Sequence, residues 1–253
     1  MKTGGRIVLC AGLKSSGSTW LYNAVIQLMR VSVRASGDRP PVVRTFYAED
    51  VATFPPAVRQ TDCLIVKTHI PSPALRFLVR FTRGTVFISV REPRDAIASL
   101  MQRFDHEFDT CLEEVSAGAA AVLELRNSGR HLLLRYENRF TQNRTSLTKI
   151  ASRLGVTVNR DIIEKFRSNL TPENVSRKVE ALRRKGAFGR KPNPNSFDPL
   201  THWHPGHVGD GRIGKYSEVL SLAQQRATLS RLHEYCRTFG YPTLHSSRAK
   251  KHR

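Results

Sequence analysis

The chain of 253 residues has only four cysteines and is poor in acidic residues, with 21 Asp and Glu against 41 Lys and Arg and a net charge of +20. The cysteines are single and widely separated, which is typical of reduced thiols in a cytoplasmic protein and excludes a dense disulfide framework or a CxxC metal pair. The excess of basic residues predicts a protein that handles anions: a nucleotide, a sulfated or phosphorylated acceptor, nucleic acid or a membrane surface.

Long apolar runs are also missing. No uninterrupted apolar stretch is long enough to cross a bilayer, and the run over residues 7–13 is interrupted by Gly12 and too short for a signal peptide. We therefore predict a soluble, cytoplasmic protein without a transmembrane segment. A chain of this length buries a sizeable core, so we expect one domain over residues 1–245 and a disordered basic tail over residues 246–253.

Apolar patterning predicts the fold class. Four short apolar runs have the character of buried strands: residues 6–11, 63–67, 85–90 and 131–135. Apolar residues at helical spacing predict seven helices: residues 18–31, 72–81, 93–104, 112–127, 141–154, 172–184 and 216–239. Such alternation predicts an α/β fold with three layers, α/β/α, around a central, mostly parallel sheet. Residues 39–56 and 185–212 are expected to be loops, the second a mobile lid.

The first predicted strand leads into a glycine-containing turn. Gly12 and Gly17 are spaced as in GxxxxGK[ST], but Ser18 stands where a nucleotidase has lysine. Backbone N–H groups of the turn and the positive end of the following helix favour a phosphate, and the hydroxyls of Ser16, Ser18 and Thr19 add donors. A turn that merely connects a strand to a helix would have a similar pattern.

Polar residues also follow the other strands, at the edge where open parallel sheets bind ligands. Lys67 and His69, two residues apart in VKTHIP, can point the same way, and His69 suits a general base because its ordinary pKa is near neutrality. A histidine that only caps backbone groups is the alternative. Arg91 and Ser99, in REPRDAIAS, can hold a phosphate from two sides, unless Ser99 faces solvent. Tyr136 follows the last strand.

These motifs, in this order, resemble those of the cytosolic sulfotransferase family, which transfers a sulfuryl group from 3′-phosphoadenosine 5′-phosphosulfate (PAPS) to an acceptor. Family members carry a PKSGTTW loop, a KTH-P segment and an R-x7-S segment, and this chain has KSSGSTW, KTHIP and REPRDAIAS. LLLRYEN and GRIGKY are similar to the family's tyrosine-bearing strand end and late glycine-rich segment. The resemblance extends from about residue 7 to about residue 220 and implies a P-loop NTPase-like fold.

The resemblance also implies residue roles. The 5′-phosphosulfate and adenine side of the cofactor would be bound by four residues: Gly17, Ser18, Thr19 and Trp20. The 3′-phosphate would lie near Arg91, Ser99 and Arg212, and the adenine near Tyr136. His69 would take the proton of the acceptor, and Lys67 would stabilise charge beside it.

The chain departs from the family pattern in the loop. The family's catalytic lysine stands two residues before the glycine, where this chain has Ser15, and Lys14 lies one place earlier. Either the loop bulges so that Lys14 still reaches the bridging oxygen, or Lys67 and backbone donors stabilise the leaving group instead. The late segment around Arg212 also differs from the family's usual sequence.

We therefore predict a PAPS-dependent sulfotransferase that needs no metal, in which His69 deprotonates a hydroxyl or amine acceptor. Basic side chains and N–H donors can stabilise in-line transfer of a sulfuryl group, which carries less charge than a phosphoryl group. The acceptor can be a carbohydrate or anionic, and no nucleic-acid partner is expected. Two alternatives stay open: a metal-dependent nucleotide kinase or NTPase, with Glu137 as its acid, and a non-catalytic anion-binding protein.

Two further segments allow simpler interpretations. The histidines of THWHPGH are His202, His204 and His207, and they are spaced for a metal but have no acidic or cysteine partner beside them, so acceptor contact or loop polarity explains them better. The basic stretch RKVEALRRKG, residues 177–186, is either a solvated charged face or a surface for an anionic acceptor.

Overall fold

The computed structural model describes residues 6–35, 43–47, 63–127, 131–189 and 196–244. These residues form a five-stranded sheet in the order β2-β3-β1-β4-β5, and every neighbouring pair is parallel. The strands are β1 (Arg6–Gly12), β2 (Val43–Tyr47), β3 (Cys63–Thr68), β4 (Thr85–Val90) and β5 (His131–Arg135). The predicted central parallel sheet is confirmed, and all four predicted strands belong to it.

Strand β2 corrects the expectation that residues 39–56 are a loop. The proline pairs at the two ends of that stretch suggest irregular structure, yet five residues between them pair with β3. A short strand at the edge of a sheet pairs with only one neighbour. Its sequence signal is weak because it has too few residues to show a clear alternation of apolar and polar side chains. The rest of this stretch lies outside the described residues.

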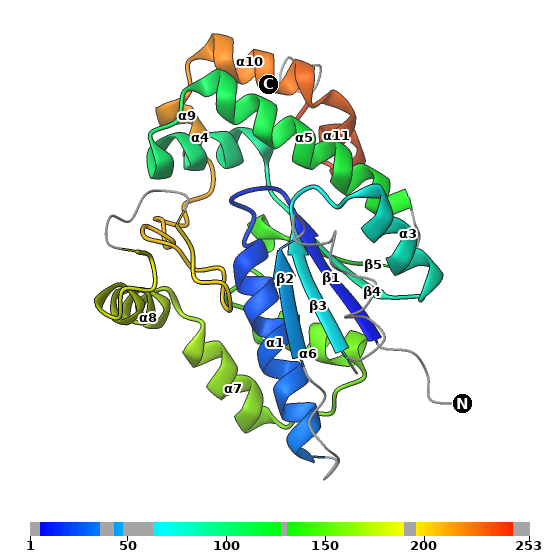
Figure 1. The fold of residues 1–253 in the computed structure, drawn as a ribbon. Coiled ribbons are helices and arrows are strands. Elements are labelled where there is room, and N and C mark those ends of the chain that lie inside the picture. The colour runs from blue at the N-terminus through cyan, green and yellow to red at the C-terminus, as the bar shows by residue number, and fades with distance from the viewer. Residues whose placement is uncertain (1–5, 36–42, 48–62, 128–130, 190–195, 245–253) are drawn as a thin grey trace.

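Helices cover both faces of the sheet, which gives the three predicted layers (Figure 1). Alternate residues of β1 enter opposite cores, with Leu9 on one side and Val8 on the other. One core includes α3 (Pro73–Phe81), α4 (Pro93–Phe104), α5 (Phe108–Asn127), α10 (Leu222–Arg231) and α11 (His233–Phe239). The other includes α1 (Ser18–Ala35), α6 (Arg144–Leu154), α7 (Arg160–Asn169) and α8 (Pro172–Arg184). Burial on both faces explains why the strands are continuous apolar runs.

Helix boundaries differ from the predictions in several regions. Helix α7 lies where no helix is predicted, because its sequence RDIIEKFRSN is mostly polar and buries only Ile163 and Phe166. The predicted helix over residues 216–239 is three helices, α9 (Tyr216–Val219), α10 and α11. A capping box at Ser221 starts α10 and explains the first break. Helices α5 and α6 start at residues 108 and 144 rather than 112 and 141.

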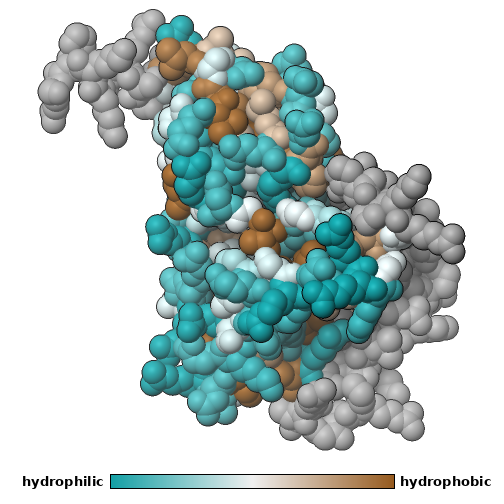
Figure 2. Space-filling model, turned by 90° about the vertical axis from the view of Figure 1, so that its left-hand side faces the viewer, coloured by the Kyte–Doolittle hydropathy of each residue, from teal (hydrophilic) through white to brown (hydrophobic). Residues whose placement is uncertain are grey.

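The surface agrees with the basic composition. On the face shown in Figure 2, hydrophilic side chains predominate and small apolar patches lie between them. Within the described ranges, no helix combines the length and the apolar character needed to cross a membrane. The predicted basic tail lies outside the described residues, and the single-domain boundary at residue 245 stays a prediction.

Candidate functional site

The carboxyl ends of the strands open into a cavity of about 830 Å³, which is within the usual range for ligand sites. Residues at or after the ends of all four predicted strands line it together with Arg212 of the late segment: Lys14, Gly17, Ser18, Thr19, Trp20, Lys67, His69, Arg91, Ser99 and Tyr136. Residues that are distant in sequence therefore meet at one edge of the sheet, as the parallel topology requires.

Ser16 supports the loop and does not line this cavity. Its buried hydroxyl donates to the carbonyl oxygen of Leu13 at 2.6 Å and lies 2.7 Å from Ser89 Oγ. Gly12 permits this close approach of β1 and β4, because a Cβ at Gly12 would lie 2.1 Å from Ser89 Oγ. The hydroxyl therefore ties the loop to β4, and its donation to a bound phosphate stays a prediction.

The loop between β1 and α1 contains two residues with a left-handed backbone. The φ angle is 61° at Ser15 and 82° at Gly17. A Cβ at Gly17 would also lie 2.9 Å from the ring of Phe140. A non-glycine residue in this conformation costs about 1–3 kcal/mol, and such strain clusters at functional sites. Helix α1 starts at Ser18, so its first N–H groups lie beside this turn and favour an anion there.

The two lysines of the site have different partners. Lys14 Nζ lies 3.0 Å from Glu114 Oε2 on α5, so the lysine next to the family's position is paired with an acid. Lys67 is buried at the end of β3. Burial lowers the pKa of Lys67 to about 8; the nearby Cys10 raises it in part and Lys14 lowers it further. Which of the two lysines acts beside the reacting group stays a prediction.

His69 has a defined tautomer. Its Nδ1 lies 2.7 Å from the carbonyl oxygen of Gly12. Because a carbonyl oxygen can only accept, Nδ1 carries the proton and Nε2 carries the lone pair. Burial, and then the charge of Lys67, lower the pKa of His69 to about 3. His69 is therefore neutral near pH 7, and a neutral imidazole with an unprotonated Nε2 has the form that a general base needs.

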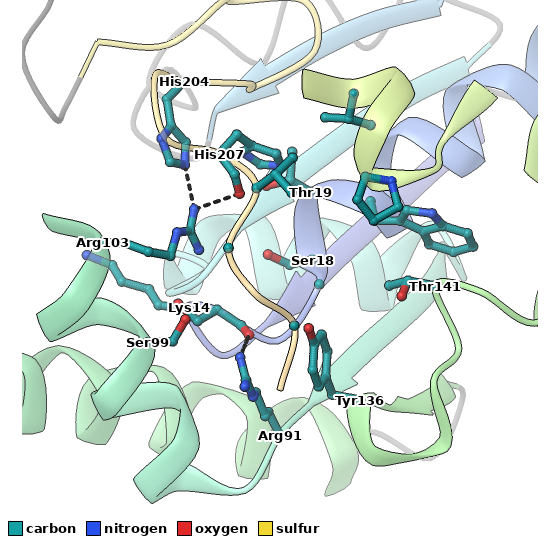
Figure 3. A pocket seen from close by; sticks show the side chains of 18 of the residues that line it. Lys14, Ser18, Thr19, Arg91, Ser99, Arg103, Tyr136, Thr141, His204 and His207 are labelled. Atoms are coloured by element: carbon teal, nitrogen blue, oxygen red, sulfur yellow. Dashed lines mark hydrogen bonds between the residues drawn. The ribbon is translucent and has the colours of Figure 1, made fainter. Parts of the chain in front are cut away.

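Arg91 joins two segments that are far apart in sequence. Arg91 lies on the same side of the cavity as Tyr136 (Figure 3). Its Nη1 donates to the carbonyl oxygen of Ser15 at 3.0 Å, and its Nη2 donates to that of Arg212 at 2.8 Å. The guanidinium carbon lies 4.2 Å from the ring centroid of Tyr136. These partners are neutral, so none of them balances the charge of Arg91. A buried guanidinium in such surroundings suits a phosphate group.

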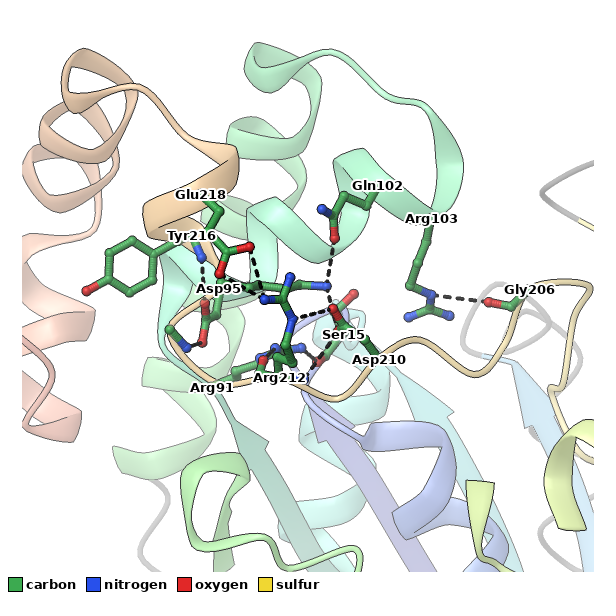
Figure 4. A network of polar contacts seen from close by, with 12 residues as sticks. Ser15, Arg91, Asp95, Gln102, Arg103, Gly206, Asp210, Arg212, Tyr216 and Glu218 are labelled. Carbon is green, nitrogen blue, oxygen red and sulfur yellow. Dashed lines mark hydrogen bonds and ion pairs between the residues drawn. The ribbon is translucent and has the colours of Figure 1, made fainter. Parts of the chain in front are cut away.

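The side chain of Arg212, which is predicted to lie near the 3′-phosphate, is paired with two acids. Its Nε lies 3.0 Å from Asp210 Oδ2 and its Nη1 lies 2.8 Å from Glu218 Oε1 (Figure 4). Its charge is therefore balanced within its own segment, and the carbonyl oxygen of Arg212 is the group that holds Arg91. A contact between the Arg212 side chain and a 3′-phosphate would have to compete with these two acids.

Three aromatic rings form the wall near the first helix. Trp20 and Tyr136 each pack edge to face against Phe140, with ring centroids 5.6 Å and 6.5 Å away. Trp20 Nε1 is buried and has no hydrogen-bond partner among the described residues. Aromatic faces with a spare N–H donor suit a purine base.

Sequence reasoning missed Arg103, which lies one helical turn after Ser99 on the same face of α4. The i, i+4 spacing is the signal that could have found it. Arg103 contacts residues 196–212, the described C-terminal part of the predicted lid, which contains no helix or strand. The side-chain amide of Asn23 holds the same segment by donating to the carbonyl oxygen of Thr201 at 2.8 Å. Movement of this segment as a lid stays a prediction.

The three histidines of this segment line the cavity. Burial is the main cause that lowers the pKa of His202 to about 3 and that of His204 to about 4, and the charge of Lys67 lowers both further. The pKa of His207 is lowered in the same way. These rings are therefore neutral near pH 7. Across the described ranges, no three His, Cys, Asp or Glu side chains are grouped so that they could hold a metal ion.

A parallel sheet whose first strand passes through a glycine turn into the N-terminus of a helix, with basic residues at the next strand ends, defines the P-loop class of nucleotide-binding proteins. Within that class, the family model described as the sulfotransferase domain matches residues 6–198. The chain belongs to this sulfotransferase family.

Solved structures share the fold. The mouse sulfotransferase SULT7A1 complexed with PAP is 19% identical, and the match covers 92% of this chain and 84% of that chain with a TM-score of 0.65. Retinol dehydratase in a complex with retinol and PAP is 15% identical, with coverage of 92% and 82% and a TM-score of 0.61. These likenesses confirm the predicted P-loop NTPase-like fold class. A search of curated proteins finds no match.

Proposed function

We propose that the protein transfers a sulfuryl group from PAPS to a hydroxyl or amine acceptor, with His69 as the general base. The observation that carries this proposal is the meeting, in one cavity, of the β1–α1 turn, Arg91 and a neutral His69. The structural neighbours are described as complexes with PAP, which is adenosine 3′,5′-bisphosphate. Family membership and the cavity together support the same nucleotide for this chain.

The residues present fit such a nucleotide. Among the buried polar atoms of cavity-lining residues that have no hydrogen-bond partner in the described part of the chain are Ser15 Oγ, Trp20 Nε1 and Arg91 Nε. Unpaired buried polar groups are costly, so these residues suit a polar ligand. We assign the 5′-phosphosulfate to the turn and first helical residues Gly17, Ser18 and Thr19. We assign the 3′-phosphate to Arg91 and Ser99, and the adenine to Trp20 and Tyr136.

The geometry supports a direct transfer. PAPS supplies the sulfuryl group, and adenosine 3′,5′-bisphosphate is the other product. His69 Nε2 accepts the proton of the acceptor as the acceptor oxygen or nitrogen attacks sulfur in line. The carbonyl oxygen of Gly12 holds Nδ1–H and keeps the ring in this orientation. Lys67 places a positive charge where negative charge develops, and Lys14 remains paired with Glu114.

The two alternative functions fit the site less well. A magnesium-dependent NTPase or kinase has a lysine after the second glycine and an acid near the phosphates. Here Ser18 follows Gly17, and Glu137 accepts from the backbone N–H of Glu92 at 2.7 Å and from the hydroxyl of Tyr241 at 2.9 Å. A non-catalytic anion-binding protein has no need for a neutral histidine of fixed tautomer among cations.

Hydroxyl groups are the better supported acceptors. The structural neighbours include complexes of retinol dehydratase with retinol and with androsterone, both of which bear a hydroxyl group. We propose the same functional group for this chain and keep an amine as the second choice. Whether the acceptor is a carbohydrate or carries a negative charge is a separate proposal. It depends on the cavity residues that are not assigned to the cofactor.

Calorimetric titration of the protein with PAP, with AMP and with ATP plus magnesium tests the proposed function. We expect PAP to bind most tightly, because the 3′-phosphate adds contacts with Arg91 and Ser99. Tighter binding of magnesium-ATP would select the kinase or NTPase. Equal binding of all three nucleotides that weakens steeply with salt would select the anion-binding protein.

Raising the pH through about 8 is expected to lower the kcat/KM for PAPS, because this is where Lys67 loses its proton. The ratio kcat/KM reports ionisations of the free enzyme, so the pKa of the buried lysine applies directly. Initial rates are measured by the release of PAP with an acceptor that the wild type uses. In Lys67→Arg, whose guanidinium stays charged, the alkaline loss should move to higher pH. An alkaline loss that keeps its midpoint in Lys67→Arg would contradict this role.

A further inference from the structure

Arg103, at one end of the cavity, is a basic residue that is not among the residues assigned to the cofactor. Arg103 comes from α4, one helical turn beyond Ser99. Figure 3 shows Arg103, His204 and His207 on one side of Ser18, and Arg91 and Tyr136 on the other. Arg103 therefore contacts the wall formed by residues 202–209, while Arg91 is still close enough to influence its pKa.

The partners of Arg103 are neutral acceptors. Its Nε donates to the carbonyl oxygen of Gly206 at 3.3 Å (Figure 4), and its Nη2 donates to that of His207 at 3.0 Å. Nη2 also lies 3.1 Å from His204 Nε2. His204 Nδ1 lies 2.8 Å from the carbonyl oxygen of Pro205, so Nδ1 carries the proton and Nε2 accepts. These bonds orient the guanidinium without balancing its charge.

Two other basic residues of the same cavity are balanced by acids. Lys14 pairs with Glu114, and Arg212 pairs with two carboxylates of its own segment. Within the described ranges, Arg103 forms no ion pair with an acid. Burial, and then the charge of Arg91, lower the pKa of Arg103 to about 10, which leaves the side chain charged near pH 7. A partly buried charge without a counter-ion is costly, and an anionic ligand would balance it.

Polar groups on the same wall also need partners. His106 and His207 line the cavity, and each has a buried Nδ1 without a hydrogen-bond partner in the described part of the chain. The charge of Lys67 lowers the pKa values of His204 and His207, so Lys67 lies close enough to act on this wall. The wall thus combines positive charge with polar rings, and an apolar acceptor would leave both without partners.

We propose that Arg103 binds an anionic group of the acceptor, a carboxylate, sulfate or phosphate, while the hydroxyl of the same acceptor reaches His69. This inference rests on the proposed function, because it assumes that the wall formed by residues 202–209 contacts the acceptor and not the cofactor. The planar fork of arginine matches the oxygens of all three anions. Arg103 is then a residue that sets acceptor specificity, and the acceptor belongs to the acidic hydroxyl compounds.

The first experiment separates this inference from the proposed function. PAP is titrated calorimetrically into the wild type, Arg103→Gln, Arg103→Lys and Arg80→Gln, the last of which removes one positive charge from the exposed end of α3. We expect equal PAP affinities in all four proteins. If the wild type does not bind PAP, the proposed function fails. If only the Arg103 variants lose PAP affinity, Arg103 belongs to the cofactor site and the inference fails while the proposed function stands.

The second experiment tests the anion. Phenyl glucoside, phenyl glucuronide, and sulfated and phosphorylated phenyl glucosides are titrated into each PAP-saturated protein. We expect at least one anionic probe to bind the wild type about tenfold or more tightly than the neutral glucoside, as a charge-assisted hydrogen bond allows. The tightest probe identifies the anion. Arg103→Gln should remove this preference and Arg80→Gln should keep it.

Two results would overturn the proposal: no preference in the wild type, or a preference that persists in Arg103→Gln. Arg103→Gln also loses contacts with the loop, so its melting temperature is compared with that of the wild type. If that variant does not fold, Arg103→Lys tests the proposal, because lysine keeps the positive charge but lacks the planar guanidinium group. We expect the preference of Arg103→Lys to be smaller than that of the wild type, and an unchanged preference would contradict binding by the guanidinium.

Discussion

Replacing Arg91 by alanine is expected to remove the preference of the protein for PAP over AMP. The two nucleotides differ only in the 3′-phosphate, and Arg91 is buried at the end of β4 beside the β1–α1 loop. Hydrogen bonds that involve a charged group contribute about 1.5–3 kcal/mol, so PAP affinity should fall by roughly 10- to 100-fold. AMP affinity should change little. Calorimetric titration with both nucleotides measures the two affinities.

The matched control for Arg91→Ala is Arg212→Ala. Both residues line the cavity, but the side chain of Arg212 is paired with Asp210 and Glu218, and only its backbone carbonyl oxygen holds Arg91. We therefore expect Arg212→Ala to keep most of the preference for PAP. Because Arg91→Ala also removes bonds between two loops, an equal fall in PAP and AMP affinity would indicate a damaged loop and contradict a 3′-phosphate site.

The polar residues at the carboxyl edge of the sheet could be predicted because they follow from local patterns in the sequence. Strands that are buried on both faces, such as β3 and β4, consist of apolar residues. The sequence therefore shows where they end, because polar residues begin at Lys67 and at Arg91. Parallel pairing then brings these ends together whatever the loops between them do. The same reasoning could not find β2, because a five-residue edge strand between proline pairs carries little pattern.

Side-chain partners could not be predicted because they depend on packing between distant segments. Ser16 has the residue type of a phosphate donor, but its hydroxyl bonds with the carbonyl oxygen of Leu13 and with Ser89 Oγ, 73 residues away. Lys14 has the type of a catalytic lysine, but α5 brings Glu114 beside it. The interaction of Arg103 with the loop around residue 206 spans 103 positions. Residue types and spacing therefore indicate which side chains gather at the site, whereas the structure determines which of them remain available for a ligand.

Replacing His69 by alanine is expected to lower kcat for sulfuryl transfer by about 10²- to 10⁴-fold, which is the usual contribution of general base catalysis. PAP affinity should stay within a few-fold of the wild type, because His69 is assigned to the acceptor and not to the nucleotide. The release of PAP measures kcat, and calorimetry measures PAP affinity. His69→Gln keeps a polar group of similar size but supplies no base, so it should be as slow as His69→Ala. A His69→Gln variant with near wild-type kcat would show that His69 only orients the loop.

The pH dependence gives an independent test of the same role. Because burial and Lys67 hold the pKa of His69 near 3, its base form predominates at every pH above that value. An ordinary histidine would lose the base form as the pH falls through about 6.5. We therefore expect kcat/KM to stay level as the pH falls from neutral through about 5, without an acidic loss centred near 6.5. An acidic loss at that pH that disappears in His69→Ala would mean that His69 is solvated and protonated in the free enzyme, and that the bond from Nδ1 to Gly12 does not keep Nε2 ready to accept a proton.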